Sequence, residues 1–297
     1  MKNKMTTKLR DLLGKPGVIV APCAYDCVSL RIIEKMGFKV ALHGGYNIGA
    51  SLLGIPDIGL ITMTESVGQA RNMAYSTNIP LICDVDEGFG GINNVMRTTR
   101  EVIRSGLAGM YIEDQVFPKR CPALGGNKVI SLEDMIIKLK IASKVRSEED
   151  PDFVIIARTH SSRTIGIEEA VRRGIKYAEV GADAIFVDLG YSEDVINELQ
   201  IISKEISPSA HLIANMTETV GRPMLTNKEL YDMGFKIVIY PVTLIITAAA
   251  SLVKVLKELN DKGTTRELVN EMMPLAELGE LLGIGEVRKF ENEFQNE

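Results

Sequence analysis

Short apolar runs alternate with segments of helical periodicity along nearly the whole chain. The helical segments place apolar residues three or four positions apart, with charged residues on the opposite side. The pattern predicts eight strands, at 18–22, 40–43, 81–86, 108–113, 153–159, 184–188, 212–215 and 237–240. It predicts helices at 28–36, 63–75, 93–104, 132–145, 167–180, 192–206 and 227–233.

Several helices run into a glycine and then directly into a strand, as at Gly37, Gly106, Gly181 and Gly234. This junction is typical of β/α alternation, which requires a parallel sheet. Eight such units close naturally into a TIM (β/α)8 barrel, so we predict one α/β-barrel domain over residues 1–297. The alternative is an open doubly wound sheet, but no G-x-G-x-x-G follows the first strand.

The C-terminal part holds more apolar helix than eight units need. Residues 237–255 are interrupted by polar positions and by Pro241, so they indicate a strand, a turn and a helix rather than a membrane span. Residues 261–265 are typical of a connector, and 265–297 form a helical extension of the same domain in which 275–294 is apolar on one side. This surplus helix needs a partner surface. The helix could be exchanged between subunits, or it could pack across its own barrel.

Composition limits which kinds of partner and which cellular compartment we expect for the protein. The chain is 45% hydrophobic and 25% charged with a net charge of −5, and it lacks a long basic run, so we expect no nucleic-acid partner. Residues 1–10 carry no apolar core of a signal peptide. The four cysteines have no zinc-site spacing. We therefore expect free thiols, no membrane segment and a cytoplasmic location. The cysteines are Cys23, Cys27, Cys83 and Cys121.

Polar residues gather where the predicted strands end, which is where TIM barrels carry their chemistry. They come from six of the strands and the loops that follow them. These residues are His43, Gly44, Gly45, Asp57, Asp84, Asp86, Glu113, Asp114, Arg158, Thr159, His160, Asp188, Asn215, Thr217 and Glu218.

Two acids interrupt the third strand at alternate positions, Asp84 and Asp86. Period-two alternation would point both carboxylates to one face, and burying them there is costly unless a cation offsets their charge. Hard oxygen ligands on a rigid strand suit Mg2+ or Mn2+. The alternative is ordinary turn and cap chemistry before Gly88.

Basic residues accompany these acids. Together with Glu113, the two aspartates converge with Arg158 and Lys119, as expected for a site that holds a metal and a small carboxylate-bearing substrate. A ring of structural ion pairs is the alternative.

Cys121 follows Lys119 and Arg120 in a loop, and neighbouring cations favour the thiolate, which suits an acid/base that exchanges a proton with carbon. A passive loop thiol is the alternative.

Five motifs resemble the isocitrate lyase and phosphoenolpyruvate mutase superfamily, in order along the chain. They are D-V-D-E-G-F-G at 84–90, Y-I-E-D-Q-V at 111–116, P-K-R-C at 118–121, I-I-A-R-T at 155–159 and I-A-N-M-T-E at 213–218. The resemblance implies an α/β barrel that holds Mg2+ and an α-keto or α-hydroxy acid, passes through an enolate-like species, and exchanges its eighth helix in a homo-oligomer, a dimer or tetramer. K-R-C is similar to the carbon–carbon lyases, in which the matching cysteine is the proton donor.

The resemblance implies a role for each site residue. Asp84 would bind the metal directly, with Asp86 and Glu113 acting directly or through water. Cys121, Lys119 and Arg158 would be catalytic. Substrate would be bound by Gly44, Gly45, Asp57, Arg158, Asp188, Asn215 and Thr217.

The chain departs from the lyases at two places. Pro122 and Ala123 follow the cysteine where the lyases read Gly-His, and Asp188 stands where they usually place Glu. In addition, H-G-G-Y at 43 and I-P-D-I-G-L-I-T at 55 are closer to the decarboxylases and mutases. The expected activity is cleavage of a 2-hydroxy acid, of 2-methylisocitrate or dialkylmalate type, into a 2-oxo acid and a carboxylic acid. The alternative is a phosphonomutase, of carboxyphosphonoenolpyruvate or phosphoenolpyruvate type, or an oxaloacetate decarboxylase. A scaffolding protein on an inactivated barrel would have lost the metal acids, which are all present.

Overall fold

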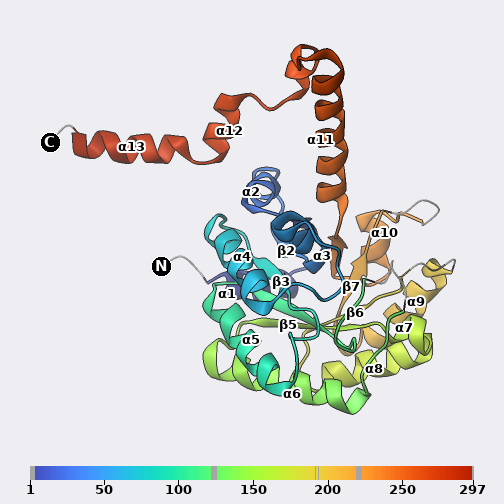
Figure 1. The fold of residues 1–297 in the computed structure, drawn as a ribbon. Helices are drawn as coiled ribbons and strands as arrows, with labels where there is room; N and C mark the ends of the chain where they lie inside the picture. The colour runs from blue at the N-terminus through green and yellow to red at the C-terminus, as the bar shows by residue number, and fades with distance from the viewer. Residues whose placement is uncertain (1–3, 122–125, 191, 193, 219–222, 296–297) are drawn as a thin grey trace.

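The computed structural model describes residues 4–121, 126–190, 192, 194–218 and 223–295. Eight parallel strands close into a barrel in chain order, β1 to β8, and helices surround it (Figure 1). The predicted TIM barrel is therefore confirmed. The strands are β1 Ile19–Ala24, β2 Ala41–His43, β3 Leu81–Asp84, β4 Gly109–Glu113, β5 Val154–Thr159, β6 Ala184–Val187, β7 His211–Asn215 and β8 Ile237–Tyr240.

Strand register carries polar residues to one end of the barrel. The barrel closes where β1 pairs with β8, and β4 pairs with β5 so that Glu113 lies beside Arg158. Because side chains alternate along a strand, the position two residues before each inward-facing polar residue also faces inward. Ile82 and Ile156 hold two such positions in the core of the barrel, below Asp84 and Arg158.

The outer helices follow their strands much as the periodicity predicts. They are α2 Cys27–Lys35, α4 Met63–Tyr75, α5 Ile92–Arg104, α6 Leu132–Glu149, α8 Ile167–Glu179, α9 Val195–Ile206 and α10 Asn227–Asp232. Asp26, Thr62, Ser131 and Thr226 cap four of them, each accepting a hydrogen bond from the backbone N–H three residues on. Helix α6 continues four residues beyond its predicted end, and α9 begins three residues later than predicted.

The periodicity missed four short elements. These are α1 Met5–Gly14, α3 Gly45–Ile48, η1 Gly49–Leu53 and α7 Ser161–Thr164. Helix α1 buries Thr6, Leu9 and Leu13, and its Arg10 donates hydrogen bonds to the carbonyls of Asp152 and Phe153 just before β5. Three buried positions in a mostly polar segment give too weak a periodicity to predict this helix.

The last part of the chain leaves the barrel as an arm, formed by α11 Thr243–Lys262, η3 Arg266–Glu271, α12 Leu275–Leu281 and α13 Ile284–Gln295. Helix α11 rises from the barrel, α12 returns toward α2, and α13 extends outward (Figure 1). No described residue of α11, α12 or α13 is buried. Leu244 at the start of α11 packs against the barrel core and Leu268 of η3 is buried, but most of the remaining arm faces solvent. The single helix predicted over 275–294 is broken at Gly283, whose φ of 88° ends α12.

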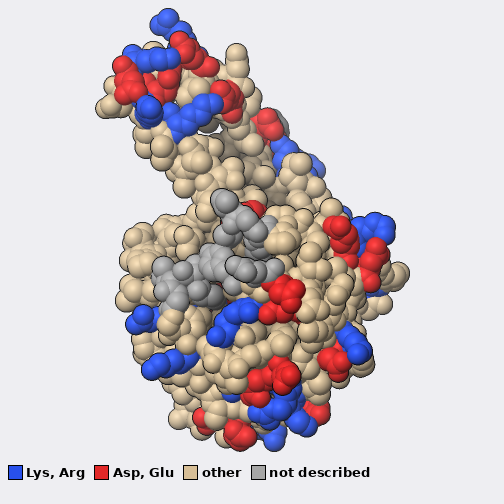
Figure 2. Space-filling model, turned by 90° about the vertical axis from the view of Figure 1, so that its right-hand side faces the viewer, with Lys and Arg blue, Asp and Glu red and all other residues tan. Residues whose placement is uncertain are grey.

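The arm is held to the barrel by few contacts. Arg31 of α2 donates a hydrogen bond to the carbonyl of Leu281 (2.8 Å), and Lys35 pairs with Glu277 (2.7 Å). At the far end of α11, Lys254 pairs with Glu271 across to η3, and side chains of both charges cluster there (Figure 2). Among the described helices, none combines the length and the hydropathy that a membrane span needs.

Candidate active site

A cavity of about 250 Å3 opens at the carboxyl ends of the strands. Most of the residues predicted for substrate binding and catalysis line it. They are Gly44, Gly45, Asp57, Asp84, Cys121, Arg158, Asp188, Asn215 and Thr217. The other three predicted residues, Asp86, Glu113 and Lys119, are buried around it. The structure therefore brings all the predicted residues into one region, although they come from six different strands, β2 to β7, and the loops that follow them.

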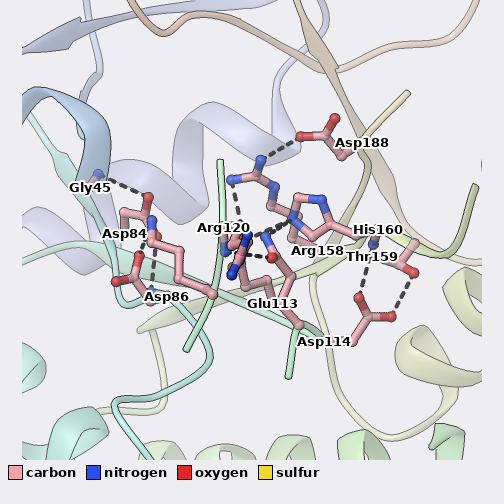
Figure 3. Close-up of polar contacts among 12 residues, drawn as sticks. Gly45, Asp84, Asp86, Glu113, Asp114, Arg120, Arg158, Thr159, His160 and Asp188 are labelled. Atoms are coloured by element: carbon pink, nitrogen blue, oxygen red, sulfur yellow. Dashed lines mark hydrogen bonds and ion pairs between the residues drawn. The ribbon is translucent and has the colours of Figure 1, made fainter. Parts of the chain in front are cut away.

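Asp84 ends β3 and is oriented by two backbone N–H groups. Its Oδ2 accepts a hydrogen bond from Gly45 (2.9 Å) and its Oδ1 accepts one from Asp86 (3.0 Å; Figure 3). A Cβ at Gly45 would lie 3.0 Å from Asp86 Oδ1 and 3.1 Å from Asp84 Oδ2, so a larger residue here would press on both carboxylates. The Gly45 N–H that was predicted to bind substrate is thus directed at Asp84.

Asp86 reaches the site for a different reason than predicted. Strand β3 ends at Asp84, and Asp86 has a φ of 48°, in the left-handed region. A turn, rather than strand alternation, therefore directs its carboxylate. The Asp86 carbonyl accepts a hydrogen bond from Glu113 N–H (2.9 Å), which anchors this turn to β4.

Lys119 lies among the acids of the site. Its Nζ is 2.5 Å from Asp57 Oδ1 and 2.8 Å from Asp86 Oδ1, and the residue is 4% exposed. Burial would lower the pKa of Lys119, but Asp86, Asp84 and the other acids more than offset it and raise this pKa well above its ordinary value. Lys119 is therefore a fixed positive charge at the base of the site.

Glu113, Arg158 and His160 form a second buried cluster. His160 Nε2–H donates to Glu113 Oε2 (2.8 Å), and Arg158 Nη1 lies 3.5 Å from the same oxygen. Burial would raise the pKa of Glu113, but His160, Arg158 and Lys119 lower it to about 2. Arg158 also pairs with Asp188 (Figure 3). Its guanidinium lies over the ring of Phe186, 4.7 Å from the ring centroid.

The site holds more acidic than basic side chains. This excess of negative charge indicates whether a metal cation fits there. In the described chain, Asp57, Asp84, Asp86, Glu113 and Asp188 gather around Lys119 and Arg158. Burial is the main cause that raises the pKa of Asp86 well above its usual range, and Asp84 and Glu113 add to it. Glu113 Oε1 is buried without a hydrogen-bond partner in the described structure, and Asp86 Oδ1 has only its ion pair with Lys119. A further cation would satisfy these oxygens.

The arrangement limits how such a cation would be held. Within the described ranges, no three His, Cys, Asp or Glu side chains lie together as a complete ligand set. One direct carboxylate, with waters bridging to the others, is the usual way in which proteins hold Mg2+. The donor set therefore fits a hard cation bound through Asp84, with Asp86 and Glu113 further out.

Part of the cavity lining is apolar, and the sequence pattern alone did not point to it. It is formed by Cys23, Leu42, Tyr111, Phe186, Ile239 and Val242. Tyr111 and Phe186 precede Glu113 and Asp188 by two residues, so strand alternation could have identified them as inward-facing. Cys23 of β1 is buried and also contacts the cavity.

Cys121 lines the cavity from the segment that connects β4 to α6. Its backbone N–H donates to the carbonyl of Asp57 (3.0 Å), and the N–H of Arg120 donates to Gln115 Oε1 (2.9 Å). The segment bearing the thiol is thus tied to β4 and to the loop after β2. Pro122 and Ala123 lie outside the described residues.

A closed parallel barrel with a charged cavity at the carboxyl ends of its strands defines a TIM-barrel enzyme. Residues 9–260 match the family described as phosphoenolpyruvate phosphomutase. The chain therefore belongs to the phosphoenolpyruvate mutase family, within the superfamily that it shares with isocitrate lyase.

Relatives are similar over almost their whole length. The chain is 38% identical to 2,3-dimethylmalate lyase of Eubacterium barkeri, over 97% of each chain. It is 34% identical to 2-methylisocitrate lyase of Halalkalibacterium halodurans, over 95% of this chain and 90% of that one. A structure of oxaloacetate acetylhydrolase matches with a TM-score of 0.91 and 31% identity, over 98% and 97% of the two chains. The chain is thus an enzyme of a superfamily of metal-dependent lyases and mutases that act on small carboxylic acids.

Proposed function

We propose that this protein is a Mg2+-dependent carbon–carbon lyase that cleaves a 2-hydroxy acid of the dialkylmalate or 2-methylisocitrate type. The products would be pyruvate or a related 2-oxo acid and a carboxylic acid. The observation that carries the proposal is that Cys121 lines the same cavity as Asp84 and Arg158. A proton donor to carbon therefore stands within one small cavity with the groups that would hold a metal and a carboxylate.

The polar and apolar residues that line the cavity suggest how substrate binds. Arg158, Asn215 and Thr217 offer donors to carboxylate oxygens on the polar side. Tyr111 and Phe186 offer an apolar surface for an alkyl substituent. Asp84, Asp86 and Glu113 would hold the metal, which lowers the pKa of the substrate hydroxyl when it is bound.

Cleavage can be written with the residues of this chain. The 2-hydroxyl loses its proton, the C2–C3 bond breaks, and C2 becomes the carbonyl carbon of the 2-oxo acid. The electron pair moves onto C3 and its carboxylate, close to the positive charge of Lys119 and the amide of Asn215. Cys121 then gives its proton to C3. The hydroxyl proton passes to solvent water, and the Cys121 thiolate takes a proton back from solvent after the cleavage, so the reaction balances without another reactant.

Two other activities of the superfamily compete with this proposal. A phosphonomutase or an oxaloacetate decarboxylase would use the same metal-stabilised enolate but would need no thiol acid. The similarity to oxaloacetate acetylhydrolase favours testing oxaloacetate in particular. The position of Cys121 in the cavity favours the lyase.

The deciding experiment is a substrate panel assayed for release of 2-oxo acid with Mg2+. It contains 2,3-dimethylmalate, 2-methylisocitrate, isocitrate, oxaloacetate and phosphonopyruvate. We expect the highest kcat/KM with one of the first two. Exclusive turnover of oxaloacetate or phosphonopyruvate would replace the proposal with one of its alternatives.

We also propose that the arm covers a second copy of the chain, in a dimer or tetramer. The support is the apolar surface of the arm, where Leu252, Val253 and Leu256 are each at least 60% exposed in the single chain. Burial against a partner would remove this surface from water. Helix exchange is the form of assembly that a projecting α11 favours.

A further inference from the structure

His160 connects two parts of the site that the proposed mechanism treats separately. It directly follows β5 and is 3% exposed. Its Nε2–H donates to Glu113 Oε2 (2.8 Å), and the side-chain nitrogen of Gln115 lies 3.2 Å from the same ring nitrogen. Gln115 Oε1 in turn accepts the backbone N–H of Arg120 (2.9 Å). Because Nε2–H is donated to Glu113, the ring meets Gln115 by a packing contact and not by a second hydrogen bond. One imidazole therefore contacts both a proposed metal acid and the residue that holds the Cys121 loop.

The backbone of His160 is held in place by Asp114. Asp114 is fully buried, and its Oδ1 accepts the N–H of His160 (2.9 Å). The other oxygen of Asp114 accepts hydrogen bonds from Thr159 (2.7 Å), Arg173 (3.0 Å) and Tyr177 (2.9 Å). Figure 3 shows Asp114 turned away from the cavity toward Thr159 while His160 lies on the side of Glu113. Because Arg173 and Tyr177 stand one turn apart on α8, this helix supports the imidazole through Asp114.

Loss of the imidazole would have a specific consequence for Glu113. Glu113 Oε1 has no hydrogen-bond partner in the described structure, so Oε2 and its contacts set the orientation of the carboxylate. Without His160, Arg158 at 3.5 Å would be the remaining charged contact of Oε2. Glu113 would then turn toward Arg158 and compete with Asp188 for it.

We propose that His160 is a positioning residue that orients Glu113 toward the metal site and, through Gln115, sets the position of the loop that carries Cys121. It does not touch the reacting atoms. The inference rests on the proposed function in one respect, since it takes Glu113 to be part of a cation site. Partners that orient metal-binding groups typically change metal affinity about 10–100-fold when they are removed.

The test uses direct binding of Mn2+ to the full-length protein, followed by calorimetry, and the rate at which iodoacetamide alkylates Cys121, followed by mass spectrometry. We expect His160→Ala to weaken Mn2+ binding about tenfold or more and to change the alkylation rate several-fold. His160→Gln keeps a side-chain N–H that can reach Glu113, so it should recover most of the Mn2+ affinity. Gln115→Leu should change the alkylation rate while Mn2+ affinity stays within about twofold, because only the link to the loop is broken.

His211→Ala is the matched control, since His211 begins β7 at the opposite end of the barrel, and it should change neither measurement. If folded His160→Ala and Gln115→Leu, checked by circular dichroism, bind Mn2+ and react like the wild type, the inference is wrong. If His160→Gln fails to recover Mn2+ affinity, the link to Glu113 is wrong. A wild-type protein that binds Mn2+ but cleaves no acid of the panel would contradict the proposed function alone. If the wild type binds no divalent cation, the proposed metal site is wrong. The alkylation rates of Cys121 then test whether His160 positions the loop.

Discussion

The carboxyl end of the barrel and the C-terminal arm depart from the usual distribution of residues in opposite ways. At the barrel end, Asp84 and Glu113 are 5% and 2% exposed, whereas in the arm Leu252 and Phe290 are 61% and 65% exposed. Charged groups are normally outside and large apolar patches inside. Buried acids that exceed their basic partners indicate a small charged ligand, and an exposed apolar helix indicates a protein surface.

The two regions also differ in how rigidly they are held. Each carboxylate of the site has backbone or side-chain contacts from neighbouring strands, for example Asp84 with Gly45 and Glu113 with His160. The arm meets its own barrel through few contacts, such as those of Arg31 and Lys35. A preorganised site suits catalysis, and a projecting arm suits assembly. Changes in the site should therefore alter chemistry without altering assembly, and changes in the arm should alter assembly.

The largest effect is expected from Asp84→Ala. This change removes the carboxylate that would bind the metal directly, so turnover should fall below detection, and EDTA should abolish wild-type turnover reversibly. The oligomer seen by light scattering should be unchanged. Asp183→Ala is a matched control outside the cavity, because Asp183 pairs with Arg10 and Arg146. Full activity in a metal-free wild-type enzyme would end the metal mechanism.

The next effect concerns the proton donor. Cys121→Ser should lower kcat about 10²–10⁴-fold, since a hydroxyl is a much weaker acid than a thiol. Mn2+ binding and the circular dichroism spectrum should match the wild type. Cys27→Ser, at the start of α2, is the control. Near-normal turnover of the best substrate by Cys121→Ser would favour the mutase or decarboxylase alternative.

A smaller effect is expected on substrate choice. Pro122 and Ala123 replace a Gly-His pair in the lyases, so a substrate with a third carboxylate loses one charged contact of about 1.5–3 kcal/mol. The kcat/KM for 2,3-dimethylmalate should exceed that for isocitrate by about tenfold or more. The double substitution Pro122→Gly with Ala123→His should reduce this ratio. A higher kcat/KM for isocitrate in the wild type would contradict the prediction.

Substitutions in the arm should change the oligomeric state more than the catalytic activity. Leu252→Asp with Leu256→Asp places two charges on the exposed apolar side of α11, and burying them against a partner would cost several kcal/mol. We expect a shift toward the monomer in light scattering at micromolar concentration. Lys257→Glu, at a charged position of the same helix, should leave the mass unchanged. A wild-type protein that is monomeric at all concentrations would overturn the proposed assembly.

The alternation of apolar runs and periodic segments was sufficient to predict the barrel and its strand order. Each β/α unit is a local pattern, and eight parallel units have a preferred way to close. For the same reason the polar residues at the strand ends could be predicted to meet. Asp84, Arg158, Asp188 and Asn215 follow from strand alternation and need no knowledge of neighbouring strands.

Tertiary structure decided what these residues contact. Lys119 pairs with Asp57 and Asp86, and the Gly45 N–H is directed at Asp84, because loops distant in sequence converge over the barrel. The position of Asp86 depends on a left-handed turn rather than on strand alternation. His160 acquired a proposed role only when Gln115 and Glu113 were seen beside it. Sequence periodicity determines which face a side chain occupies, whereas its partners depend on the register of strands and loops that only the closed barrel brings together.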